Sequence, residues 1–100
     1  MTLAALLRAS VPFATVRGEI DTEVTSVCDR VEAVTPGALF VAHKGMDNRT
    51  TITQALERGA VVIISEVAVS VPLKFRTTVP FVIVMDADET YQLMSAAIAG

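Results

Sequence analysis

Two short apolar runs on either side of a helical segment constrain the fold of this sequence more than any other feature. Residues 39–42 and 61–64 are continuous apolar runs of the length expected for buried strands. Between them, residues 50–58 follow a helical pattern of apolar side chains, and Gly59 is a natural left-handed stop. A strand, a helix and a strand at this spacing predict a crossover in which the helix covers two parallel strands.

Further elements are predicted on both sides of this crossover. Residues 2–10 are predicted to form a helix that is capped by Thr2, and residues 23–27 are predicted to form a half-exposed strand. Residues 81–85 are predicted to form the last buried strand, which is followed by a helix capped by Asp86 or Asp88. Thr50 or Thr51 is the expected cap of the middle helix. A loop is expected over residues 12–18, a short edge strand through Val67, Val69 and Val71, and a solvated loop over residues 74–78.

These elements predict the fold class. We expect one α/β domain over residues 1–100, with a small open, mostly parallel or mixed sheet of four to five strands and helices on its faces. A chain that is 52% hydrophobic and 19% charged is too apolar for disorder.

Charge and cysteine content limit which partners and which cellular compartment are expected for the chain. The net charge is -3, and the 8 Lys and Arg residues are scattered without a basic stripe, so a nucleic-acid partner has little electrostatic support. Cys28 is the single cysteine, which favours a reducing compartment. The apolar runs are strand-sized and the N-terminus lacks the basic region of a signal peptide, so we expect a cytoplasmic protein without a membrane span.

The sequence offers no catalytic constellation. His43 has no cysteine or second histidine at metal-ligand spacing, so neither a metal site nor a cofactor is predicted for this chain. The glycine-rich phosphate loops of dinucleotide-binding and P-loop proteins are absent as well. Cys28 is interpreted as a small core residue. Asp86 is interpreted as a helix cap, because a phosphoacceptor receiver domain needs more acids near the first strand.

Two polar segments are better candidates for a binding site. Residues 26–30 and 43–49 follow successive predicted strands, and ligands of open α/β sheets lie beyond the carboxyl ends of the strands. Their side chains, with the backbone amides around Gly45, could hold a uracil and a diphosphate. Ordinary solvated loops explain the same residues, and the residues alone leave both interpretations open.

Several stretches resemble the N-terminal domains of Mur ligases. Residues 34–45 are similar to the pattern V-x-P-G-x-L-F-V-A-x-x-G of that family, and residues 47–60 to its D-G-[HR] followed by I-x-x-A-x-x-x-G-A. Residues 61–66 and 79–84 are similar to its next two strands. The resemblance runs from about residue 23 to residue 100 and is strongest to the UDP-N-acetylmuramoyl-tripeptide synthetases, which add diaminopimelate or L-lysine. The D-alanyl-D-alanine-adding ligase has a related first domain and stays open as an alternative.

The resemblance implies a division of labour. In that family the first domain binds the UDP end of a UDP-N-acetylmuramoyl-peptide, whereas ATP, Mg²⁺ and the incoming amino acid are held by a central and a C-terminal domain. This chain would then be an inactive piece of an ATP-dependent ligase. The residues expected to bind the UDP-sugar are Ser26, Val27, Asp29, Arg30, His43, Lys44, Gly45, Met46 and Asn48.

Two departures from the family pattern affect these residues. Cys28, Asp29 and Arg30 stand where the family has Asp-Ser-Arg, so that either Asp29 or Ser26 replaces the serine, depending on the alignment. The loop after Gly45 is about two residues shorter than usual, which brings Met46 and Asp47 into the ligand-contacting turn. A free-standing interaction or regulatory module with the same fold is therefore the alternative to a UDP-binding domain.

Overall fold

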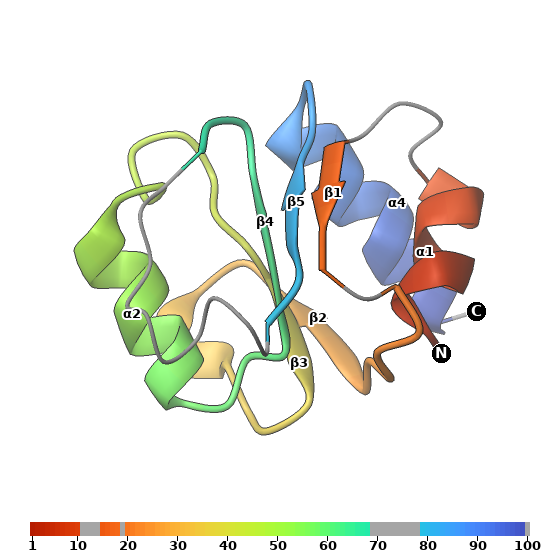
Figure 1. Cartoon of the computed structure of the whole chain (residues 1–100), viewed down its shortest axis with the longest axis horizontal. Coiled ribbons are helices and arrows are strands. Elements are labelled where there is room, and N and C mark those ends of the chain that lie inside the picture. The colour runs from red at the N-terminus through yellow and green to blue at the C-terminus, as the bar shows by residue number, and fades with distance from the viewer. Residues whose placement is uncertain (11–14, 19, 69–78, 100) are drawn as a thin grey trace.

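The computed structural model describes residues 1–10, 15–18, 20–68 and 79–99, and these form one sheet with helices on both faces (Figure 1). The elements are α1 (Leu3–Ser10), β1 (Thr15–Arg17), β2 (Ser26–Cys28), the 3-10 helix η1 (Val31–Ala33), β3 (Ala38–Val41), α2 (Arg49–Glu57), β4 (Val62–Ser65), β5 (Phe81–Ile83) and α4 (Ala87–Ala99). In these ranges the sheet has five strands in the order β1-β5-β4-β3-β2. Strands β2 to β5 are parallel, and β1 is antiparallel to β5. The predicted α/β fold class is confirmed.

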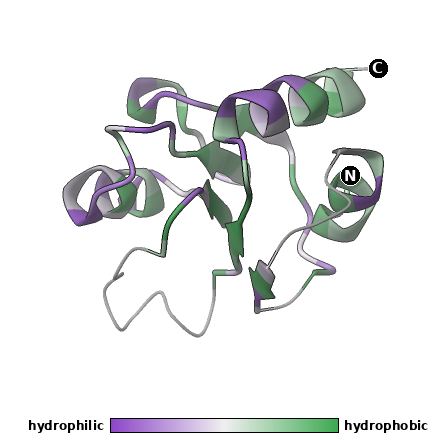
Figure 2. Ribbon diagram, turned by 90° about the horizontal axis from the view of Figure 1, so that it is seen from above, coloured by the Kyte–Doolittle hydropathy of each residue, from purple (hydrophilic) through white to green (hydrophobic). Residues whose placement is uncertain are grey.

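Side chains alternate between the two faces of the sheet, and each face has its own core. In β3, Leu39 and Val41 belong to the cluster beneath α1 and α4, whereas Phe40 belongs to the cluster beneath α2. All three side chains are fully buried. Figure 2 shows these apolar strands between the helices on either side. The strands are therefore covered on both faces, which explains their continuous apolar sequence.

The predicted crossover is confirmed, with one correction at its start. Helix α2 lies between the parallel strands β3 and β4 and buries Ile52, Ala55 and Leu56. Its cap is Asn48, whose Oδ1 accepts the Thr51 N–H at 2.9 Å, and not Thr50 or Thr51 as expected. Asparagine is among the strongest capping residues, and the helix begins one residue earlier than predicted as a result.

The first and last helices are confirmed as predicted. The Thr2 hydroxyl accepts the Ala5 N–H at 3.2 Å, as a cap does. In α4, Met94 is fully buried, and Tyr91 and Ile98 pack against the same cluster. The Asp86 carboxylate accepts the Glu89 N–H at 3.0 Å, which confirms the capping interpretation of Asp86.

Four strand predictions need correction. The last strand, expected over residues 81–85, ends at Ile83, and Met85 beyond it is 87% exposed. The strand expected over residues 23–27 is found as Ser26–Cys28, because Glu23 pairs with Thr2 in an isolated bridge. Strand β1 lies inside the loop expected over residues 12–18, where it pairs with the outer edge of β5. Val67 is not in a strand, since its N–H donates to the Ser65 hydroxyl. Val69, Val71 and the loop expected over residues 74–78 lie outside the described residues.

The chain is closely packed around two glycines at the amino ends of the parallel strands. Gly59 has a φ of 105°, which confirms the left-handed stop, and a Cβ built there would lie 2.7 Å from the Pro36 Cα. A Cβ on Gly37 would lie 2.6 Å from the Thr25 side chain. By contrast, a Cβ on Gly45, beyond the carboxyl end of β3, would meet nothing within 4 Å. The chain is therefore tightly packed around Gly37 and Gly59 at the amino ends of the strands, whereas there is free space around the Gly45 turn.

This contrast predicts different costs for two glycine substitutions. We expect Gly59→Ala to lower the free energy of unfolding by about 2–4 kcal/mol, because a left-handed conformation and a backbone clash add together. Gly45→Ala, with a φ of 92° and open space, should cost only about 1–2 kcal/mol. Urea unfolding followed by circular dichroism measures both. Equal losses in the two variants would contradict the packing described at Gly59.

Candidate functional site

The segments that follow the parallel strands gather at one edge of the sheet. Strand β2 runs into Asp29, β3 into Ala42 and His43, β4 into Glu66, and β5 into Asp86 at the start of α4 (Figure 1). The Ala42 N–H donates to the Ile64 carbonyl at 2.8 Å and so extends the pairing of β3 with β4 up to His43. This edge is where open α/β sheets bind ligands.

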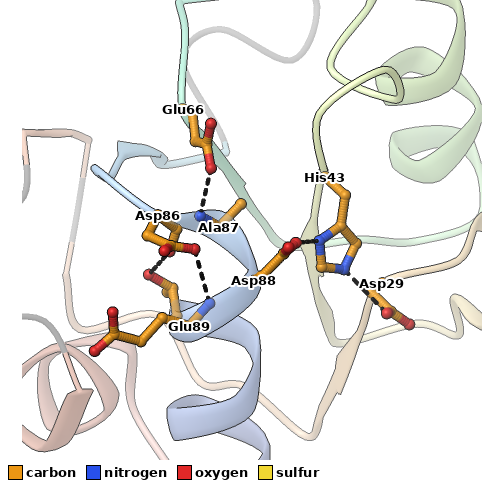
Figure 3. A network of polar contacts seen from close by, with 8 residues as sticks. Asp29, His43, Glu66, Asp86, Ala87, Asp88 and Glu89 are labelled. Carbon is orange, nitrogen blue, oxygen red and sulfur yellow. Dashed lines mark hydrogen bonds and ion pairs between the residues drawn. The ribbon is translucent and has the colours of Figure 1, made fainter.

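His43 is the centre of the polar contacts at this edge (Figure 3). Its Nε2 lies 3.0 Å from Asp29 Oδ2, and its Nδ1 contacts the carboxylate of Asp88 in the first turn of α4. The Tyr91 ring approaches the imidazole edge-on, with centroids 5.7 Å apart and planes at 71°. The side chains of His43 and Asp29 are 22% and 31% exposed, so they lie at the surface while still being held.

Among the described residues, this edge offers hydrogen-bond acceptors and no activated nucleophile. His43 contacts two carboxylates and an aromatic ring. The Cys28 thiol is buried and donates to the Ala33 carbonyl at 3.3 Å. No group of three His, Cys, Asp or Glu side chains suited to a metal ion occurs in the described ranges. Each carboxylate keeps free lone pairs, which can accept N–H or O–H groups of a ligand.

The turn after β3 brings a second set of groups to the same edge. The Met46 N–H donates to the His43 carbonyl at 2.8 Å, which closes a tight turn with Gly45 at its left-handed position. Lys44 and Gly45 are exposed in this turn. The Asn48 amide donates to the Gly45 carbonyl at 3.5 Å while its oxygen caps α2. The turn and the start of α2 are therefore one hydrogen-bonded unit.

The two helices that begin at this edge differ in charge. Helix α2 has no acidic residue in its first turn, and Lys44 and Arg49 are exposed beside it. Helix α4 has Asp88 and Glu89 in its first turn, and the Glu66 carboxylate accepts the Ala87 N–H at 2.7 Å. Because a helix N-terminus attracts anions, the start of α2 suits an anion, whereas the start of α4 is already occupied by carboxylates.

The residues expected at the site fall into three groups. Asp29 and His43 are in direct contact, and Lys44, Gly45, Met46 and Asn48 follow on the same turn. Arg30 is exposed next to Asp29. Ser26 and Val27 lie before the end of β2, with Val27 packed toward the α1 and α4 cluster and the Ser26 hydroxyl 3.9 Å from the Cys28 sulfur. The Met46 side chain also packs against the α2 cluster.

The part of this edge that α4 supplies is not among the residues predicted from the sequence. Asp88 is expected only as one of two candidate caps of the last helix, and Glu66 and Tyr91 have no expected role at this site. A signal was present, since β5 is also a parallel strand and its carboxyl end must lie at the same edge as those of β2 and β3.

The chain is similar to two Mur ligases, although no family model matches it. It is 47% identical over 49 residues, 47% of this chain, to a UDP-N-acetylmuramyl-tripeptide synthetase of Roseiflexus sp. (strain RS-1). It is 37% identical over 79 residues, 77% of this chain, to a UDP-N-acetylmuramoyl-L-alanyl-D-glutamate--2,6-diaminopimelate ligase of Chlorobaculum tepidum. These matches span only 10% and 15% of the two relatives. They support the Mur ligase family and do not single out one member.

The helices of the described ranges are short or interrupted by polar residues. None of them is long and apolar enough to cross a bilayer.

The contact between Glu66 and α4 predicts a specific loss of stability. In Glu66→Ala the Ala87 N–H loses a charged acceptor in a partly buried position, so we expect the free energy of unfolding to fall by about 1–3 kcal/mol. Glu57→Ala, an exposed change of the same charge at the end of α2, should stay within about 0.5 kcal/mol of wild type. Thermal unfolding of the three proteins makes the comparison. Indistinguishable variants would show that Glu66 does not hold α4.

Proposed function

We propose that this chain binds the uridine diphosphate end of a UDP-N-acetylmuramoyl-peptide for a Mur-type ligase. In this proposal the ATP, the Mg²⁺ and the incoming amino acid are held by other domains of the full-length protein, and the 100-residue chain alone is inactive. The similarity to two ligases whose names specify UDP-N-acetylmuramyl substrates supports the substrate class. The proposal covers the UDP-N-acetylmuramoyl-tripeptide synthetases and, as the alternative member, the D-alanyl-D-alanine-adding ligase, because both act on a UDP-N-acetylmuramoyl-peptide.

The observation that carries the proposal is the meeting of two segments far apart in sequence. Asp29 after β2 and His43 after β3 lie 3.0 Å apart at the carboxyl edge of the sheet. A uridine diphosphate needs a site formed by two segments, because its base offers hydrogen-bonding groups and its phosphates carry negative charge a few ångströms away. Since Asp29, and not Ser26, lies beside His43, the geometry favours the alignment that places Asp29 at the serine of the family pattern.

Charge suggests how the nucleotide is oriented. A phosphate 4 Å from a carboxylate is repelled by about 1 kcal/mol in water and about 4 kcal/mol near a protein surface. The diphosphate should therefore lie away from Asp29 and Asp88, at the start of α2, where the two cations Lys44 and Arg49 outnumber the one acid, Asp47, and the Gly45 turn has open space. The uridine, with its N–H and O–H donors, should lie toward Asp29.

A free-standing interaction module is the second candidate, and the acidic contacts of His43 favour it. Two carboxylates at the site weaken the attraction for a diphosphate, as expected of a domain that has lost its ligand. The two candidates differ in a simple way, because only the first binds UDP.

Titration of UDP into the 100-residue chain, by calorimetry or NMR, tests the proposal. We expect weak binding, with a Kd of about 1 mM, because one domain supplies only part of the contacts. Lys44→Ala and Arg49→Ala should each weaken UDP about three- to ten-fold, since each removes one charge near the phosphates. Arg58→Ala removes the same charge at the far end of α2, where the guanidinium donates to the Glu32 carbonyl, and should leave the affinity unchanged.

Uridine provides the control for the phosphates. Its weaker binding should be insensitive to Lys44→Ala and Arg49→Ala, because it carries no diphosphate. The absence of any UDP binding at 10-fold the expected Kd, roughly 10 mM, would reject the proposal and favour the interaction module. Equal losses in the Lys44, Arg49 and Arg58 variants would reject the proposed orientation of the nucleotide.

A further inference from the structure

The contacts of His43 assign it a different role from the ligand contact that its position in the sequence suggests. Both ring nitrogens already face a carboxylate, Nε2 that of Asp29 and Nδ1 that of Asp88. An imidazolium donates to both, and a neutral imidazole has one N–H for one of them. In either form the ring has no nitrogen left over for a ligand unless one carboxylate is displaced.

We propose that Asp88 and His43 are positioning residues that orient Asp29, the carboxylate that accepts a hydrogen bond from the uridine. This inference rests on the proposed function and extends it to α4. Asp88 fixes the imidazole through Nδ1, the imidazole holds Asp29 through Nε2, and the second carboxylate oxygen of Asp29 stays available to the ligand.

The imidazole is held by three contacts. Its two nitrogens, which are separated by one ring carbon, each face a different carboxylate, and the Tyr91 ring packs against it with the two planes at 71°. A lone surface ion pair would leave the ring free to rotate, and it would contribute little. Three contacts define one orientation of the ring, which is what a group that positions another must have.

Asp88 is itself placed by contacts outside the His43 cluster. Its neighbour Ala87 donates to Glu66 at 2.7 Å, and Glu89 donates to Asp86 at 3.0 Å, so the backbone on both sides of Asp88 is anchored (Figure 3). The contacts of Asp29, His43 and Asp88 are thus joined, through the backbone between Ala87 and Asp88, to the contact that Glu66 makes after β4. The 76% exposure of the Asp88 side chain means that its removal should leave the core intact.

Because His43 is the single histidine of the chain, its ring nitrogens can be observed without assignment ambiguity. We would record the imidazole ¹⁵N signals and the UDP affinity of wild type, Asp88→Ala and Asp88→Asn at one pH. The matched control is Glu89→Gln, which removes the neighbouring negative charge from the same helix turn. Backbone amide spectra establish that each variant is folded.

In Asp88→Ala we expect the Nδ1 signal to shift and the UDP affinity to fall about three- to ten-fold, with the amide spectrum of the core unchanged. Asp88→Asn keeps an acceptor oxygen, so its Nδ1 signal and its UDP affinity should both lie between those of Asp88→Ala and wild type. Glu89→Gln should alter neither.

The outcomes separate this inference from the proposed function. If wild type binds no UDP, the proposed function fails first and the inference falls with it. If wild type binds UDP and Asp88→Ala binds equally well, the proposed function stands and the positioning role is wrong. An unchanged Nδ1 signal in Asp88→Ala overturns the inference as well, because no contact with His43 was then present to lose.

Discussion

The parallel register of β2, β3, β4 and β5 determines where the other parts of the molecule lie. Parallel neighbours must be joined by connections that return from the carboxyl end of one strand to the amino end of the next. The segments that leave these four strands therefore all begin at one edge. This single fact places Asp29, His43, Glu66 and Asp86 together, although the chain separates Asp29 from Asp86 by most of its described length.

The two ends of the parallel sheet differ in how closely the chain is packed. At the amino end, Gly37 and Gly59 pack so closely against Thr25 and Pro36 that no side chain could replace their hydrogens without movement. At the carboxyl end, the turn at Gly45 has open space around it, and its neighbours donate and accept through exposed groups. The closest packing is therefore found where the strands begin. Exposed polar groups lie where the strands end, at the edge where open α/β sheets bind ligands.

The elements that could be predicted from the sequence are those whose signals are local. The α2 crossover, the Gly59 stop and the Asp86 cap each depend on residues within a few positions of one another. Strand β1 was missed because it has three residues and exists by pairing with β5, more than 60 positions later. Asp88 was missed for the same kind of reason, since its partner His43 lies 45 residues earlier and their contact depends on the folded sheet. The resemblance suggested the ligand class that is proposed for the chain, but it did not predict the contacts of His43 with Asp29 and Asp88, which depend on the fold.

Mapping UDP onto the backbone amides by ¹H–¹⁵N correlation spectra decides whether the ends of β2 and β3 form one site. We expect shifts at residues 29–30 and 43–49 together, with the amides of Gly37 and Gly59 at the opposite edge unchanged. Shifts confined to the amino edge, or in only one of the two segments, would contradict a site formed where β2 and β3 end.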